Sequence, residues 1–342
     1  MKKDKKATIA ETIFVIGIPF ISAATMVFKM NQMRTQVYRE LLKNKEKKRE
    51  NCSNRKQDAI PSRRILITGQ GSYIGEAVKK WLMNYPERYE IDTVDMIKDA
   101  WKNTNFSLYD VVYHVAGIAH ADVGSVTEEQ KKLYYQVNTE LAVKQFIFMS
   151  SMIVYSGCKE KFITEKTNPK PLNFYGDSKW QADQRIQSLK DDKFKVVILR
   201  PPMIYGKGSK GNYPELAKLA VRIPFFPKTN NRRSMLHIDN LCEFVKLMID
   251  NEESGVFFPQ NGEYTNTSEM VQMISIVHNH FIFIIPGMSW VIRIMKRIPG
   301  KIGGLSEKVF GDLAYDLTLS EYKDNYCVHT LLDSIKATEE TE

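Results

Sequence analysis

Cysteine and histidine are scarce in this 342-residue sequence, which holds four of the first and six of the second. The cysteines form no CxxC pair, and His278 and His280 stand two residues apart with no further candidate ligand nearby. Such spacings are not typical of a disulfide framework or of a metal site. We therefore expect a reducing compartment and no bound metal.

The excess positive charge is restricted to the N-terminal end of the chain. Residues 1–64 contain 16 Lys and Arg against 6 Asp and Glu, whereas the remaining residues contain 33 against 34. A nucleic-acid-binding enzyme carries its basic charge across a folded face. The nearly neutral body therefore excludes nucleic acid as an expected partner.

Long hydrophobic runs are few, and the first of them lies near the N-terminus. Residues 12–28 hold no charged side chain, and as a helix this run would span roughly 25 Å, the lower limit for a bilayer. Basic residues are more numerous after the run than before it, which places the following chain in the cytoplasm. The pattern predicts a single-pass anchor on the cytoplasmic side of the cell membrane, with a basic linker up to residue 63.

Three other structures would produce a similar N-terminal pattern. A signal peptide is one, because Ser22-Ala23-Ala24 offers a cleavage-like site. An interfacial helix and a re-entrant segment are the others, and a protein without an anchor would be cytoplasmic.

Ordered structure is expected from Arg64 onward. Residues 65–68 are a short apolar run of the kind found in buried parallel strands, and a glycine-rich turn and a helical pattern follow. Glycines let the backbone approach a pyrophosphate closely, and the start of a helix directs N–H groups at the anion. The residues expected at this dinucleotide site are Gly69, Gly71, Ser72, Tyr73, Ile74 and Gly75.

The next strand, residues 91–95, ends in a carboxylate. Asp95 lies 20 residues after Gly75, where it would accept hydrogen bonds from the adenosine ribose. A carboxylate there repels a 2′-phosphate, so NAD is favoured over NADP as the cofactor.

Further strands alternate with helices along residues 111–262. This alternation predicts an α/β fold, a doubly wound parallel (Rossmann) sheet with ligands at the carboxyl ends of its strands. Small or rigid residues at those ends leave room for the cofactor, and those expected beside it are Ala116, Gly117 and Pro202. We expect this domain to comprise residues 64–204 and 235–262, and a smaller substrate lobe to comprise residues 205–234 and 263–342.

The pattern Tyr175-Gly-Asp-Ser-Lys179 places a phenol and an ammonium on one face of a helix. An unperturbed tyrosine titrates near ~10, too high for a base at neutral pH. The Lys179 charge and the positive nicotinamide of NAD⁺ are expected to lower that pKa, so that Tyr175 takes a hydroxyl proton as hydride leaves the same carbon. Ser151, at the end of strand 145–149, would hydrogen-bond the reacting oxygen.

Residues 64–262 resemble the extended short-chain dehydrogenase/reductase superfamily, within the NAD-dependent epimerase/dehydratase family and nearest to its UDP-glucose 4-epimerase-like members. The segments that carry the resemblance are ITGQGSYIG, Asp95, HVAG, SSMIVY, YGDSK, RPPMIYG and RRSMLHIDNL. It implies that Ser151, Tyr175 and Lys179 are catalytic and that Tyr175 and Lys179 also contact NAD. It further implies that Asn138 lies near the nicotinamide and that Arg233 binds a nucleotide diphosphate. Asn212 falls in the expected substrate loop.

The residues after Ser151 discriminate between reactions. Sugar dehydratases of this family carry Asp and Glu where this chain has Met152 and Ile153, and the related decarboxylases keep the Glu. Neither Met nor Ile can move a proton, which leaves 4-epimerisation of a UDP-hexose or reduction of a keto sugar. The expected role is in surface polysaccharide synthesis, with a homodimer as a possible assembly.

Three departures from the family pattern bear on activity. Ser72 stands at the family's middle glycine, where it would cap the helix, and Met203 replaces an Asn that some epimerases use against the substrate. The helix that begins near Thr127 lacks about 10–12 residues before strand 145–149, roughly 15–18 Å of helix. A non-catalytic NAD-binding remnant is therefore the alternative to an enzyme.

Four further stretches after residue 204 have a readable pattern, and three of them fall in the expected lobe. Residues 205–222 read as a loop followed by a helix, and residues 235–251 read as a helix. Residues 266–269 resemble the capped start of another helix. Residues 281–297 are apolar, and a core strand followed by an amphipathic helix is favoured there over a second membrane segment.

Overall fold

The computed structural model describes residues 62–96, 101, 103–115, 143–160, 162–287 and 311–340. The chain divides into two compact units, Met1–Ile60 and Pro61–Glu342, and everything below concerns the second. Among the helices of the described ranges, none is long and apolar enough to cross a bilayer. The expected anchor at 12–28, its linker, Ala116, Gly117, Asn138, the shortened helix and the helix after residue 287 lie outside the described residues.

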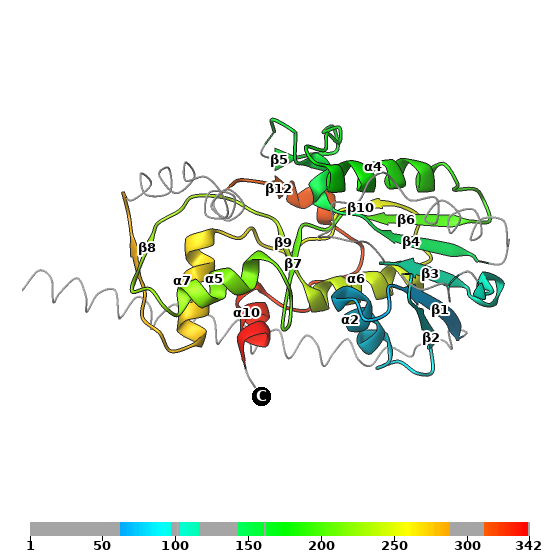
Figure 1. Cartoon of the computed structure of the whole chain (residues 1–342), viewed down its shortest axis with the longest axis horizontal. Coiled ribbons are helices and arrows are strands. Elements are labelled where there is room, and N and C mark those ends of the chain that lie inside the picture. Colours follow the sequence, from blue (N-terminus) through cyan, green and yellow to red (C-terminus); the bar gives the residue numbers. More distant parts are fainter. Residues whose placement is uncertain are drawn as a thin grey trace, which may run out of the picture. The chain divides into compact units, whose positions relative to one another are not determined.

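Six parallel strands form the central sheet (Figure 1). In spatial order they are β10 (Gly255–Phe257), β6 (Lys195–Leu199), β4 (Gln145–Met149), β3 (Val111–His114), β1 (Arg63–Thr68) and β2 (Tyr89–Val94). The predicted Rossmann-like sheet is therefore confirmed. Its four central strands are almost completely buried, which explains why each reads as an apolar run with little alternation.

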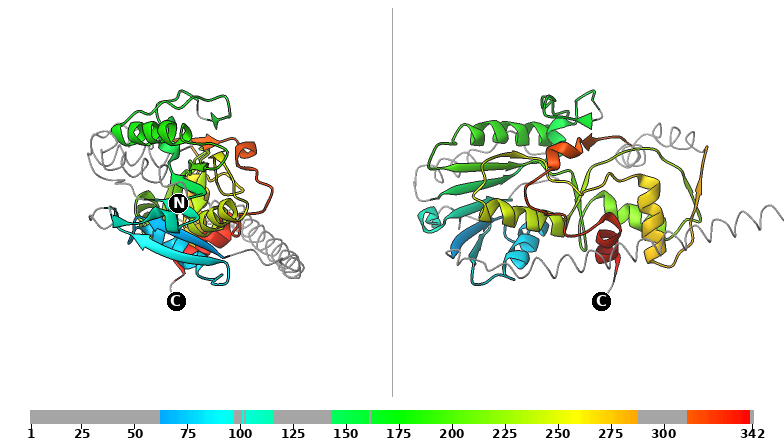
Figure 2. Two further views of the ribbon diagram at one scale, coloured as in Figure 1. Left: turned by 90° about the vertical axis from the view of Figure 1, so that its right-hand side faces the viewer. Right: turned by 180° about the vertical axis from the view of Figure 1, so that it is seen from behind.

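Successive side chains of the strands point to opposite faces of the sheet, and both faces are covered by helices (Figure 2). Ile65 and Ile67 of β1 pack with α2 (Tyr73–Leu82) and α6 (Ile238–Asp250). Leu66, between them, belongs to the core under α4 (Phe174–Gln187). The sheet is thus doubly wound, with helices α2 and α6 on one face and α4 on the other.

The remaining elements build the lobe and short connections. The helices of the lobe are α5 (Asn212–Ala220), α7 (Thr267–Val277) and α10 (Leu331–Glu339), and their shared core includes Tyr205, Met270 and Ile335. Three two-stranded parallel sheets pair β7 (Met203–Tyr205) with β9 (Met235–His237), β8 (Phe225–Pro227) with β11 (Phe283–Ile285), and β5 (Phe162–Ile163) with β12 (Ala314–Tyr315). Short 3-10 helices are η2 (Phe106–Leu108), η3 (Met152–Tyr155) and η4 (Leu317–Ser320).

Two predicted helix starts have different outcomes. The Asn266 side chain accepts hydrogen bonds from the backbone N–H groups of Ser268 and Glu269, so the predicted capped start is confirmed. The helix expected over 235–251 begins three residues late, because Met235–His237 pairs with β7 as strand β9. The pattern of this run did not distinguish a short buried strand from the first helical turn.

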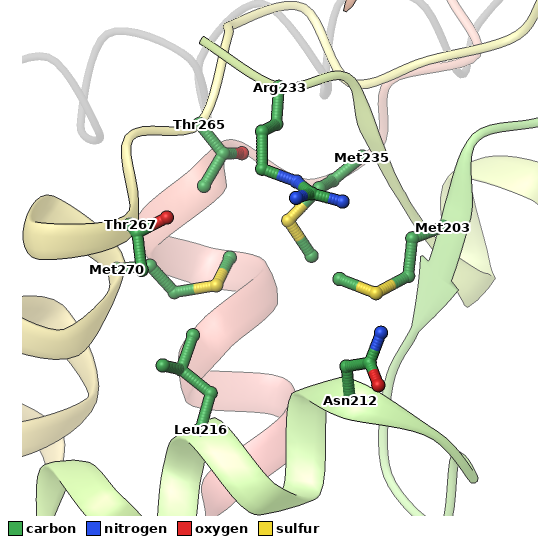
Figure 3. Close-up of a pocket in the computed structure, with 8 residues that line it drawn as sticks. All are labelled: Met203, Asn212, Leu216, Arg233, Met235, Thr265, Thr267 and Met270. Carbon is green, nitrogen blue, oxygen red and sulfur yellow. The ribbon is translucent and has the colours of Figure 1, made fainter. Parts of the chain in front are cut away.

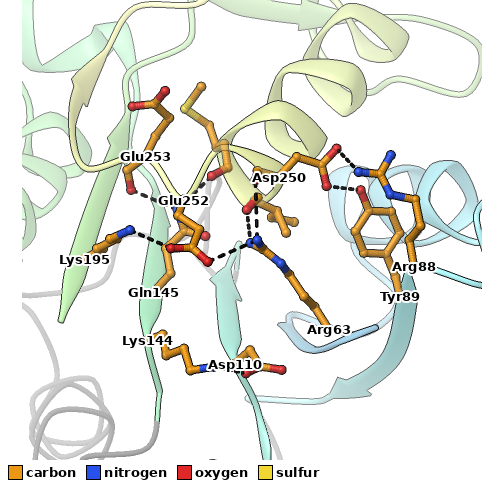
Figure 4. A network of polar contacts seen from close by, with 12 residues as sticks. Arg63, Arg88, Tyr89, Asp110, Lys144, Gln145, Lys195, Asp250, Glu252 and Glu253 are labelled. Atoms are coloured by element: carbon orange, nitrogen blue, oxygen red, sulfur yellow. Dashed lines mark hydrogen bonds and ion pairs between the residues drawn. The ribbon is translucent and has the colours of Figure 1, made fainter. Parts of the chain in front are cut away.

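Hydrogen bonds and ion pairs close the amino-terminal edge of the sheet (Figure 4). The Gln145 side-chain amide donates to the carbonyls of Met248 and Glu253 at 2.8 and 2.9 Å. The Glu252 carboxylate pairs with Arg63 at 3.1 Å and with Lys195 at 2.8 Å. Because the loop after α6 occupies this edge, the opposite, carboxyl edge is the one available to a ligand.

Strand β4 lies in the sheet despite the short connection before it. Gln145 stands opposite Val111 of β3 and Lys195 of β6, and Lys144 forms an ion pair of 3.0 Å with Asp110. The strand therefore carries Ser151 to the carboxyl edge, although its preceding crossover helix lies outside the described residues.

Candidate active site

The glycine-rich turn has the conformation that its glycines allow. Gly69 and Gly71 have φ angles of 101° and 75°, a region that disfavours side chains. The Ser72 hydroxyl accepts a hydrogen bond of 3.1 Å from the Gly75 N–H, so the predicted cap of α2 is present. The Gly71 N–H donates to the Glu76 carboxylate at 2.9 Å, which shows that this turn directs an N–H group at an anionic oxygen.

Gly75 has no room for a side chain. A Cβ there would lie 2.7 Å from the Ser72 hydroxyl oxygen and 3.1 Å from the Gly69 carbonyl oxygen. Overpacking of this kind costs ~1–3 kcal/mol, so we expect Gly75→Ala to weaken NAD binding by about 10–100-fold in calorimetric titration. Gly262→Ala is the matched control, since its Cβ would meet nothing within 4 Å. Unchanged NAD affinity in Gly75→Ala would show that the turn does not approach the cofactor.

Asp95 lies beside this turn, as its spacing predicted. It directly follows β2, whose last residue, Val94, accepts hydrogen bonds from the N–H groups of Gly69 and Gln70 at 2.9 and 3.2 Å. The first backbone hydrogen bond within α2 is donated by the Glu76 N–H to the Ser72 carbonyl. The N–H groups of Tyr73 and Ile74 lie before it, so they can donate to a ligand at the start of the helix. The turn, the helix start and the carboxylate thus fit a dinucleotide with unphosphorylated ribose.

Ser151, Tyr175 and Lys179 gather at the carboxyl end of β4. The Lys179 ammonium donates a hydrogen bond of 2.8 Å to the carbonyl of Met149, the last residue of that strand. Two residues further on, the Ser151 hydroxyl caps η3 by accepting from the Ile153 N–H at 3.2 Å. The first turn of α4, which carries Tyr175, packs on η3 so closely that a Cβ on Gly176 would lie 3.0 Å from the Ile153 carbonyl oxygen.

The expected lowering of the Tyr175 pKa is not found in the folded chain. Burial raises the pKa of this phenol, and the Lys179 ammonium does not offset that effect. The hydrogen bond that the Lys179 ammonium donates in the structure goes to the Met149 carbonyl. Tyr175 is therefore held as a neutral phenol, and a lower pKa would require a positive charge brought next to it.

Burial lowers the pKa of Lys179 to about 8, and the nearby Asp183 carboxylate opposes part of this shift. A lysine in the unfolded chain titrates near ~10.4. Above about pH 8 the unfolded chain therefore binds a proton that the folded protein has released, so the free energy of unfolding gains a component that rises with pH. We expect urea titrations from about pH 7.5 to 9.5 to show this component in the parent and not in Lys179→Met. Equal pH slopes in the two proteins would contradict the assignment.

A buried ion pair behind the trio was missed from the sequence. Arg200 donates to the Asp183 carboxylate through Nε at 2.8 Å and to the Tyr155 hydroxyl through Nη1 at 2.7 Å. Asp183 lies one helical turn after Lys179, and the Tyr315 hydroxyl donates to the Arg200 carbonyl at 2.8 Å. The pair joins α4, η3 and the end of β6. The sequence signal was an Asp four residues after Lys179 and an Arg at the end of an apolar strand.

A pocket of the lobe brings together Asn212 and Arg233, two of the four residues expected to contact the substrate (Figure 3). Met203, which replaces the family Asn, lies in the wall of this small hollow. Arg233 forms two backbone hydrogen bonds with Thr265, and burial lowers the pKa of its guanidinium. The other lining residues are Leu216, Met235, Thr265, Thr267 and Met270.

One further polar cluster lies at the start of α6. The His329 Nε2 and the Asp239 carboxylate are 2.9 Å apart, and the His237 Nδ1 accepts from the Asp239 N–H at 3.3 Å. Burial lowers the pKa of His237 to about 4, so this imidazole is neutral. One ligand atom from each lies within 4.8 Å of the others, close enough for a metal ion. The contact between His329 and Asp239 attaches the C-terminal segment to α6, and the buried His237 Nε2 has no hydrogen-bond partner among the described residues. The sequence did not reveal this cluster, because His329 lies 90 residues after Asp239.

Of the other expected cofactor residues, Pro202 is buried just beyond β6. Ala116, Gly117 and Asn138 lie outside the described residues.

Comparison with known proteins agrees with this arrangement. The NAD dependent epimerase/dehydratase family matches residues 65–258, more than half of the chain. A UDP-glucose 4-epimerase of Vibrio cholerae is 29% identical over 74% of this chain and 87% of its own length. An N-acetyl-α-D-glucosaminyl-diphospho-ditrans,octacis-undecaprenol 4-epimerase of Escherichia coli O157:H7 is 31% identical over 43% of this chain and 47% of its own length.

Solved structures share the fold. A UDP-glucuronic acid 4-epimerase from Bacillus cereus in complex with NAD has a TM-score of 0.57 and 17% identity, over 80% of this chain and 96% of its own. A dTDP-glucose 4,6-dehydratase from Bacillus anthracis in complex with NAD has a TM-score of 0.58 and 17% identity, over 81% and 95%. NAD, the cofactor that the turn and Asp95 fit, is the cofactor of the family. The chain belongs to the NAD-dependent epimerase/dehydratase family.

Proposed function

We propose that this protein is an NAD-dependent 4-epimerase of a UDP-hexose. The observation that carries the proposal is the gathering of Ser151, Tyr175 and Lys179 at the carboxyl end of β4, beside the dinucleotide turn. Its role would be in the synthesis of a surface polysaccharide.

The chain's own residues supply proton transfer and orientation. Tyr175 takes the proton of the sugar C4 hydroxyl and later returns it, and Ser151 donates a hydrogen bond to the same oxygen. The turn at residues 69–75 and Asp95 would hold NAD, which would supply reversible hydride acceptance at C4. Burial keeps the Tyr175 phenol protonated, so a lower pKa relies on the positive nicotinamide of NAD⁺ beside it, while Lys179 holds the start of α4 at the end of β4 through the Met149 carbonyl.

The short helix η3 supports epimerisation over dehydration. Met152 is buried and Ile153 is half-buried, and both stand where family dehydratases carry an acid and a base. Elimination of water needs such a pair, whereas epimerisation needs only the trio and the cofactor. A ketoreductase needs the same residues and is the alternative reaction.

A second candidate substrate is a sugar carried on a polyprenyl diphosphate. The relative from Escherichia coli O157:H7 acts on such a compound by its name. The pocket beside Arg233 favours this candidate, because Met203, Leu216, Met235 and Met270 give it an apolar wall. Arginine's forked guanidinium suits the diphosphate that both substrate classes share.

The test is incubation of the purified protein with UDP-glucose and with UDP-N-acetylglucosamine, without added NADH. A 4-epimerase converts each active substrate to an equilibrium mixture of the two C4 epimers and leaves the cofactor in its original redox state. A ketoreductase instead consumes NADH in proportion to a 4-keto sugar. Polyprenyl-diphosphate-linked N-acetylglucosamine is assayed in parallel, and inactivity on all three substrates would refute the proposal.

We also propose that residues 12–28 anchor the protein to the cytoplasmic side of the cell membrane, and that residues 205–234 and 263–342 bind the sugar. The uncharged run and the excess of basic residues after it support the anchor. Retention of the protein in membranes during alkaline carbonate extraction is expected, and release from them would contradict the anchor.

A further inference from the structure

Three phenylalanine rings lie exposed on the small β8–β11 sheet of the lobe. Phe225 of β8 stands opposite Phe283 of β11, and their stacked rings have centroids 5.8 Å apart. Phe281, just before β11, packs edge-on against Phe283 at 4.5 Å. The exposed fractions of Phe225, Phe281 and Phe283 are 54%, 68% and 52%, and we call these three residues the aromatic face.

The aromatic face points outward because the alternate residues fill the core. Phe226 and Ile282, the chain neighbours of the exposed rings, are both buried in the core of the lobe with Met270 and Ile274 of α7. Sheet pleating therefore fixes the three rings on the opposite side. Figure 1 shows this sheet at the end of the lobe farthest from the six-stranded sheet.

The chain around the aromatic face is free of acidic residues. Residues 216–238, which include β8, contain five Lys and Arg and no Asp or Glu. Residues 270–287, which include β11, contain no Asp or Glu either. Arg222 and Lys228, on either side of β8, are both exposed. The exposed charges that directly flank β8 are thus positive, and the described stretch around β11 is uncharged.

We propose that the aromatic face docks on the surface of a lipid bilayer that carries anionic headgroups. Aromatic rings enter the boundary between headgroups and acyl chains, and neighbouring lysines and arginines pair with the anionic lipids. A second protein surface would be expected to meet a mixture of both charges, which these stretches lack. The inference goes beyond the proposed reaction and does not depend on it.

This docking has a consequence for the pocket. Helix α7 lies against β8, and its residues Thr267 and Met270 line the Arg233 pocket. A bilayer at the aromatic face would hold that pocket close to the lipid surface, where diphosphate-linked lipids present their sugars.

The test places a nitroxide spin label at Phe281→Cys in the full-length protein, reconstituted in vesicles of phosphatidylcholine and phosphatidylglycerol. Cys52, Cys158 and Cys327 are replaced by serine, and the buried Cys242 is retained. The matched control is Met83→Cys at the end of α2, whose parent side chain is apolar and 60% exposed but lies outside the aromatic face. Phe225→Cys, on the paired strand, is a second labelling position.

We expect labels at 281 and 225 to collide several-fold more with oxygen, and several-fold less with a water-soluble nickel complex, than the label at 83. Vesicles of phosphatidylcholine alone should reduce this difference, because the anionic attraction is lost. Equal, water-like exposure at all three positions would overturn the proposal. Spin–spin broadening at 281 would overturn it in favour of a second copy, and shielding from both reagents in favour of another segment of the chain.

Discussion

Tyr175→Phe is expected to lower the turnover of the sugar substrate by about 10²–10⁴-fold, the range that general acid–base catalysis contributes. The substitution removes one oxygen atom from a half-buried ring and leaves the packing of α4 on η3 unchanged. NAD binding should change little, since the turn at residues 69–75 and Asp95 are unaltered. The measurements are epimer interconversion by chromatography and NAD affinity by calorimetry.

Tyr109→Phe is the matched control for this substitution. It removes a phenol oxygen whose hydrogen bond of 2.9 Å goes to Asp92, away from the carboxyl edge. Turnover should remain near that of the parent. Comparable activity in Tyr175→Phe and Tyr109→Phe would show that Tyr175 is not the acid–base group, whatever the substrate.

Arg200→Met is expected to cost the fold about 3–5 kcal/mol, the usual effect of leaving one partner of a buried ion pair without the other. Asp183 is completely buried, and burial raises the pKa of its carboxyl despite the opposing charge of Arg200. Removing Arg200 also takes the donor from the Tyr155 hydroxyl and so loosens η3. The measurement is the free energy of unfolding in urea at pH 7.

The control for the ion pair is Lys218→Met, which breaks an exposed pair with Glu215 of similar length, 3.0 Å. Exposed pairs contribute about 0–1 kcal/mol, so this variant should unfold like the parent. The double variant Asp183→Leu/Arg200→Met should regain part of the stability, because no buried charge is then left alone. A loss below ~1 kcal/mol in Arg200→Met would contradict the assigned role.

The strands were predictable because each is short, apolar and buried on both faces. Residues 65–68, 111–114, 145–149 and 195–199 belong to the described sheet as expected. The cap at Ser72 was also predictable, since a hydroxyl directly before a helical pattern can accept a hydrogen bond from an N–H group of the first turn. These features are determined by residues close together in the sequence, so a single sequence is enough to predict them.

Features that depend on distant residues were not predicted. Residues Met235–His237 form strand β9 because they pair with β7. Asp183 and Arg200 form their ion pair only when α4 packs against β6. The Tyr175 pKa was expected to be lowered by Lys179 and bound NAD⁺ together; in the chain alone burial raises it, and the Lys179 ammonium donates to the Met149 carbonyl. Spacing along a helix places two side chains on one face without fixing where each one points.

The closed amino-terminal edge of the sheet has a consequence for synthesis. Arg63 of β1 and Lys195 of β6 both pair with Glu252, and Gln145 of β4 donates to the carbonyls of Met248 and Glu253. Three strands therefore depend on the end of α6 and the loop that follows it. A ribosome adds residues in order, and domains fold as units once their last partners emerge. The growing chain therefore holds β1, β4 and β6 without their shared acceptors until residues 248–253 have left the ribosome. We expect truncation before residue 248 to leave these groups unpaired and to give an insoluble product.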